Sequence, residues 1–86
     1  MNLSLVDELT QKQADKFQLN KLDPAFINNT LAVNSEGIFN LSSKICETSG
    51  EMIIDYLINN YQNYNFELNR TGVNYEIMFR KNEVKN

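Results

Sequence analysis

The chain has 86 residues, of which 42% are hydrophobic, and it carries 8 Lys and Arg against 11 Asp and Glu. The net charge of −3 excludes a generally basic nucleic-acid-binding protein, because such proteins need a surplus of Lys and Arg to neutralise phosphates. No His is present, which excludes histidine-based acid–base catalysis and histidine metal sites, and a single Cys cannot form an internal disulfide.

The length supports one domain over residues 1–86, with a polar tail at 81–86 that we expect to fray. The first eight residues contain no basic segment ahead of an apolar stretch, so they do not predict a signal peptide. No run approaches the roughly 20 apolar residues that a transmembrane helix needs. We therefore expect a cytoplasmic protein without membrane contact.

Residues 4–18 are predicted to form an N-terminal helix. Ser4 suits the N-cap position, and Asp7 complements the exposed N–H groups of the first helical turn. Four apolar residues share one narrow face of this helix: Leu5, Val6, Leu9 and Phe17. The narrow stripe favours a helix that packs at the edge of the domain.

A short helix and a hairpin are predicted next. Asp23 suits an N-cap and Pro24 the first helical position, which indicates one or two helical turns over 24–28. Two short apolar runs, 30–33 and 38–41, then flank an Asn-Ser-Glu-Gly turn. Apolar runs around such a turn are typical of a β-hairpin.

A broad apolar face over residues 52–61 predicts the central helix. Its start has two alternatives. A capping box at 48–51 favours a start near Ser49. Apolar residues just before it continue the same face and favour a start near Ser43, with Gly50 inside the helix. An interior Gly costs about 1 kcal/mol relative to Ala, which favours the later start.

The C-terminal runs 64–68 and 73–79 alternate apolar and polar residues and predict a second hairpin. Its inner face carries Tyr64, Phe66, Leu68, Val73, Tyr75, Ile77 and Phe79. On the last strand these alternate with Asn74, Glu76, Met78 and Arg80, which are expected to face the other side. Burial of each such side chain is worth about 1.5–3 kcal/mol, so this face must pack on the central helix. Together the elements predict an α+β fold with helices on one face, in which a small antiparallel sheet of about four strands, in two hairpins, packs on the central helix.

Little in the sequence supports catalysis. Cys46 has no His to act as its base, and it falls on the apolar side of the central helix if that helix begins early, so we interpret it as a buried, inert thiol. The chain contains no calcium-type loop and no glycine-rich phosphate loop. A core this small rarely leaves a pocket of the several hundred Å³ that small-molecule sites need. We expect no catalytic residue, no cofactor and no metal.

Three acids recur every fourth residue along the central helix, Glu47, Glu51 and Asp55, and form a ridge of negative charge about 12 Å long. This ridge is either a docking edge for a basic partner or a solvated helix face, and solvated faces are the more common case. Tyr61 and Tyr64 bracket the turn after the helix. They are further candidates for partner binding, because Tyr is favoured at protein interfaces.

These features predict a small, acidic, non-enzymatic module that binds a larger protein with a basic surface and does not bind nucleic acid directly. Stoichiometric inhibitors of the phage anti-restriction or anti-CRISPR type, immunity proteins and antitoxins share this size and charge, as do many unrelated proteins. The alternative is a structural module that forms homodimers or larger homo-oligomers through an exposed edge strand at 30–33 or 73–80. A third, less favoured hypothesis is a small enzyme that uses Asp or Glu carboxylates for catalysis.

Overall fold

The computed structural model describes residues 4–42, 45, 47–71 and 74–82. The elements of this part of the chain are, in order, α1 (Leu5–Lys12), β1 (Lys16–Leu19), α2 (Pro24–Val33), β2 (Glu36–Leu41), α3 (Glu47–Asn60), β3 (Tyr64–Thr71) and β4 (Asn74–Lys81). The strands form one sheet in the order β1-β2-β4-β3. Strands β1 and β2 are parallel, and the other two neighbouring pairs are antiparallel. The predicted α+β class and four-stranded sheet are confirmed, but the sheet is mixed rather than purely antiparallel.

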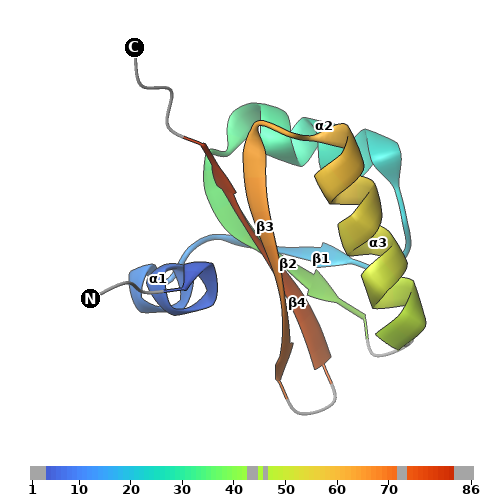
Figure 1. Ribbon diagram of the computed structural model, residues 1–86, viewed down its shortest axis with the longest axis horizontal. Helices are drawn as coiled ribbons and strands as arrows, with labels where there is room; N and C mark the ends of the chain where they lie inside the picture. The colour runs from blue at the N-terminus through green and yellow to red at the C-terminus, as the bar shows by residue number, and fades with distance from the viewer. Residues whose placement is uncertain (1–3, 43–44, 46, 72–73, 83–86) are drawn as a thin grey trace.

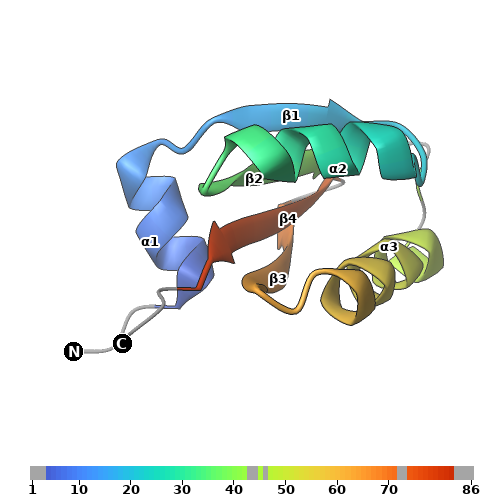
Figure 2. The same cartoon turned by 90° about the horizontal axis from the view of Figure 1, so that it is seen from above.

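Helices lie on both faces of the sheet. Figure 1 shows α1 on one side and α2 and α3 on the other, and Figure 2 shows the same separation from above. We call the sheet face toward α2 and α3 the core face, and the opposite face the α1 face. The prediction of helices on one face is wrong, because Met78, counted among the solvent-facing positions of the last strand, is fully buried with Leu9 and Ile38 under α1.

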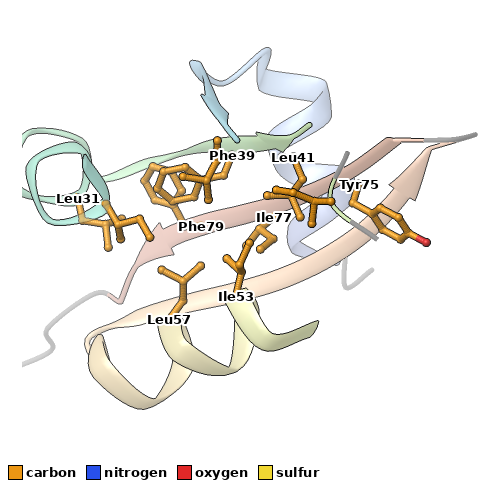
Figure 3. Close-up of a cluster of buried hydrophobic side chains, with 11 residues drawn as sticks. Leu31, Phe39, Leu41, Ile53, Leu57, Tyr75, Ile77 and Phe79 are labelled. Atoms are coloured by element: carbon orange, nitrogen blue, oxygen red, sulfur yellow. The ribbon is translucent and has the colours of Figure 1, made fainter. Parts of the chain in front are cut away.

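The main core lies between the core face and the two helices that cover it. Rows of apolar side chains cross the sheet, since Phe17 pairs with Phe39, Phe39 with Ile77, and Ile77 with Leu68. Figure 3 shows Ile53 of α3 pointing toward this face, together with the next buried residue of the helix, Leu57. These contacts fix α3 on the sheet and decide which of its sides remains in solvent.

The helix predicted over 4–18 ends at Lys12. Its predicted cap is confirmed, because the Ser4 hydroxyl accepts a hydrogen bond from the Asp7 N–H and donates one to the Asp7 carboxylate. Gln13 adopts a left-handed φ of 53°, which stops the helix. The chain then continues as β1, where Phe17 alternates onto the core face instead of joining Leu9 on a helix.

The hairpin predicted over 30–41 is also wrong. Asp23 caps α2 as predicted, with its carboxylate accepting the Phe26 N–H at 3.3 Å. The helix then continues through the first predicted strand to Val33, because Ile27 and Leu31, one helical turn apart, both reach the core. Only the second run is a strand, as part of β2.

Neither segment predicted as an exposed edge strand is an edge. Residues 30–33 are helical, and β4 lies between β2 and β3. Parallel strands need a long crossover connection, and α2 supplies it between β1 and β2. The edges of the sheet are therefore β1 and β3.

The C-terminal hairpin is confirmed, with β3 and β4 paired from Tyr64 opposite Lys81 to Thr71 opposite Asn74. The connecting residues 72–73 lie outside the described residues. At the start of the predicted tail, the Lys81 N–H donates to the Ser35 carbonyl at 2.6 Å and the Asn82 N–H to the Asn63 carbonyl at 2.7 Å. Residues 83–86 lie outside the described residues.

Helix α3 begins at Glu47, between the two predicted starts at Ser43 and Ser49. Gly50 is therefore inside the helix, where it is buried. Cys46 lies outside the described residues.

Replacing Gly50 with Ala is expected to raise the free energy of unfolding by about 1 kcal/mol, because Ala is favoured over Gly by about that amount inside a helix. A Cβ atom at this position would lie 3.5 Å from Leu41 Cδ1, an ordinary contact distance. Thermal unfolding checks the prediction, since Tm should rise by about 4–8 °C. A lower Tm would show that the helix needs a glycine here.

Candidate functional site

The side of α3 that faces away from the sheet carries both charged and apolar residues. At about 100° per residue, Glu51, Met52, Asp55, Ile58 and Asn59 fall within an arc of about 120°. All five are exposed. We call this set the exposed face of α3. Its two apolar members are prominent, since Met52 is 63% and Ile58 48% exposed.

The two acids on this face are not neutralised within the described part of the chain. Neither Glu51 nor Asp55 forms an ion pair there, whereas Lys16 pairs with Glu76, and Arg80 pairs with Glu8 and Glu36. The side chain of Glu47, the third acid of the predicted ridge, lies outside the described residues. The negative charge of Glu51 and Asp55 is thus directed toward solvent and any partner there.

A hollow of about 330 Å³ adjoins the exposed face of α3. It lies between α3 and the segment after β1, with Leu22 on one side and Met52 on the other. Its apolar lining is completed by Ile45 and Ile53, and Lys21 stands at the same hollow. Leu22 is itself 43% exposed. Apolar surface therefore continues from α3 across the hollow. A core this small rarely leaves a pocket of several hundred Å³, and this hollow is formed at the surface between two elements.

Tyr61 and Tyr64 lie apart from the exposed face of α3, and their hydroxyls are used within the fold. The Tyr61 hydroxyl donates to the Asn28 side-chain oxygen, and the Tyr64 hydroxyl donates to the Leu31 carbonyl at 2.6 Å. Both bonds hold α2 against the start of β3. Burial raises the pKa of the Tyr61 phenol, and the neighbouring Tyr56 adds to this effect, so Tyr61 remains a donor at neutral pH.

Sequence reasoning missed Met52 and Ile58 as surface residues, because both were counted on the apolar face of the central helix. The width of that face was the feature that could have revealed their exposure. Seven apolar residues lie between 52 and 61, which is more than the single stripe of side chains that contact with one sheet can bury. Only two of them on α3, Ile53 and Leu57, are fully covered.

The described residues contain no group of three or more His, Cys, Asp and Glu placed to hold a metal ion. Among the helices of the same residues, none combines the length and apolar character required to span a membrane. Comparisons with protein-family models, curated proteins and solved structures find no match to this chain.

Proposed function

We propose that this chain is a non-enzymatic cytoplasmic protein that binds a larger protein through the exposed face of α3 and inhibits it by occupying a basic surface. One observation carries the proposal: two large, solvent-exposed apolar side chains, Met52 and Ile58, share one helix face with two acids that lack an ion pair in the described part of the chain.

Apolar and acidic residues on one face serve different purposes in binding. Burying a large apolar side chain contributes about 1.5–3 kcal/mol, so Met52 and Ile58 supply affinity once a partner covers them. Met is also flexible and adapts to an irregular partner surface. Acids beside such residues attract a basic partner and orient it, which mainly raises the association rate. This combination suits a protein partner better than a polyanionic nucleic acid.

The partner surface that fits this face has Lys or Arg residues beside an apolar patch. Glu51 and Ile58 are separated by about 10 Å along the helix axis at 1.5 Å per residue, so the face spans two helical turns. The apolar hollow beside Met52 extends the contact toward Leu22. A stable interface buries about 800 Å² on each partner, so the contact must spread from α3 across this hollow.

Reversing both acids tests the proposal. The Glu51→Lys/Asp55→Lys variant is expected to bind the partner at least tenfold more weakly while its Tm stays within a few degrees of the wild type, because both side chains are exposed. The partner is first captured from the native host with the tagged wild type. Affinities are then measured by calorimetry with the purified pair.

A matched control separates local charge from total charge. The Gln11→Lys/Asp15→Lys/Gln18→Lys variant makes the same change in net charge, from −3 to +1, at three exposed positions on the α1 side. It is expected to keep the wild-type affinity, apart from a weak general effect that added salt removes. Equal loss of binding in both variants would show that only total charge matters, and unchanged binding in both would exclude the exposed face of α3.

Edge pairing is the second candidate function. β3 is an eight-residue strand at the edge of the sheet, so a second copy could extend the sheet there. Sedimentation distinguishes the two functions: pairing doubles the mass of 10.0 kDa as concentration rises, whereas the proposed binding module sediments as a single chain.

A further inference from the structure

A second hollow, of about 540 Å³, lies on the α1 face of the sheet, on the opposite side from the exposed face of α3. Helix α1 has only eight residues and covers part of this face, where Leu9 packs on Ile38. Beyond the end of α1, the strand register places four polar residues in one row across the sheet: Gln18, Asn40, Glu76 and Asn69. The hollow lies between the end of the helix and this row.

The walls of this hollow combine an apolar surface with one pair of opposite charges. Leu9, Ala14 and Ile38 supply the apolar part. Lys16 Nζ and Glu76 Oε2 face each other at 3.9 Å, the outer limit of an ion pair. The Lys16 side chain is 57% exposed, whereas the Glu76 side chain is only 17% exposed. The carboxylate is therefore the more enclosed of the two charged groups, and the ammonium is the more accessible to solvent.

The residue that ends α1 provides an independent observation. Gln13 holds a left-handed φ of 53°, a conformation in which Gly is favoured and other residues are strained. The Ala14 N–H bonds to the Leu9 carbonyl across this turn, as in a helix ending that normally uses Gly. Gln13 is one of the residues that line the hollow. Strain of this kind is characteristic of binding sites, where a side chain is required for a purpose other than stability.

We propose that this hollow binds a free apolar α-amino acid in its zwitterionic form. The ligand ammonium pairs with Glu76, and its carboxylate pairs with Lys16. One carbon atom separates the two charged groups of an α-amino acid, so a single ligand can meet both members of the 3.9 Å pair. The apolar side chain of the ligand lies on Leu9, Ala14 and Ile38.

The remaining polar groups fit the same ligand. Gln13 and Asn69 also line the hollow, and the Gln13 carboxamide can donate to the ligand carboxylate or accept from its ammonium. The carboxyl-terminal end of a helix carries partial negative charge, so the end of α1 favours the ammonium nearby. A hollow of 540 Å³ lies within the range of small-molecule sites and has room for a large aliphatic or aromatic side chain.

Titration of the purified full chain, followed by amide NMR, tests the ligand class. The probes are L-leucine and L-phenylalanine, with isopentylamine, which lacks the carboxylate, and 4-methylpentanoate, which lacks the ammonium. At least one amino acid is expected to shift the amides of Leu9, Gln13, Ile38 and Glu76 saturably, with both single-charge analogues at least tenfold weaker. Absence of saturable shifts for both amino acids, or equal binding of an analogue, would overturn the proposal.

Two variants separate binding from folding. Gln13→Gly is expected to raise Tm by several degrees, because it relieves the left-handed strain, and yet to weaken amino-acid binding severalfold. Lys16→Gln, on a largely exposed side chain, should leave Tm unchanged and weaken binding of the amino acid at least tenfold. Binding of isopentylamine should not weaken, because the change removes a positive charge that competes for Glu76. Undiminished amino-acid affinity in both variants would contradict the proposed site, whatever the partner-binding behaviour of α3.

Discussion

Leu57→Ala is expected to lower the free energy of unfolding by about 2–5 kcal/mol, whereas Ile58→Ala, one residue further along α3, is expected to change it by no more than about 0.5 kcal/mol. Leu57 is fully buried in the main core, and removing its side chain leaves a cavity between α3 and the sheet. Ile58 is 48% exposed and loses little on truncation. Denaturation with urea measures both changes.

The effects of the two substitutions on partner affinity should have the opposite order from their effects on stability, when both variants are measured under conditions where they are folded. Ile58→Ala removes a side chain that the partner would bury, so we expect the dissociation constant to rise at least threefold. Leu57 does not reach that surface, and its variant should bind with nearly wild-type affinity. If Ile58→Ala destabilised the protein as strongly as Leu57→Ala, the exposed face of α3 would be covered in solution, and the proposed binding site would be wrong.

Gly37→Ala is expected to lower the free energy of unfolding by about 1–3 kcal/mol, because the added methyl group overpacks the core. A Cβ atom at Gly37 would lie 2.8 Å from Phe79 Cζ and 3.0 Å from both the Asp15 carbonyl oxygen and Phe17 Cε2. The aromatic rings belong to a packed cluster, and the oxygen belongs to the backbone, so no flexible group can give way. Urea denaturation gives the size of the loss.

Gly50→Ala is the matched control for this substitution, since both glycines are buried within regular secondary structure and only Gly37 lacks room for a methyl group. The two variants should change stability in opposite directions. The damage in Gly37→Ala should also be local, because the displaced Asp15 carbonyl accepts the Ile38 N–H at 2.8 Å. Hydrogen exchange should therefore quicken first at Ile38 and β1. A uniform loss of protection would contradict this account.

The parts of the fold that the sequence predicts are those with one dominant local signal. The C-terminal hairpin follows from strict alternation on both strands, and the caps at Ser4 and Asp23 follow from side-chain chemistry. The failures are short segments that suit more than one structure. Phe17 fits a helical stripe with Leu9 as well as a strand, and residues 30–33 are an apolar run without a clear period.

Long-range pairing decides between these alternatives. Once β1 pairs in parallel with β2, the residues between them must cross over the sheet, and a helix is the usual way to do so. That requirement makes 30–33 helical, although its local sequence also suits a strand. The sequence of residues 30–33 does not indicate whether the strands before and after it, β1 and β2, pair in parallel or antiparallel.

The candidate sites were predictable to different degrees. The spacing of Glu51 and Asp55 places them on one side of a helix, and both are exposed on α3. The exposure of Met52 and Ile58 depends on how much of α3 the sheet covers. The spacing of apolar residues alone does not indicate that extent. The hollow at Gln13 depends on where α1 stops and on which strands pass beneath it, so it emerges only from the assembled sheet.

The position of β4 has a consequence for the synthesis of this protein. β4 is the last of the described strands, yet it lies between β2 and β3, which are joined only through it. A nascent chain emerges from the ribosome with its N-terminus first, so β2 and β3 are made while their shared neighbour is still missing. Until residues 74–81 emerge, both strands expose backbone groups that can pair with other chains. β2 and β3 therefore cannot join into one sheet before residues 74–81 have been made.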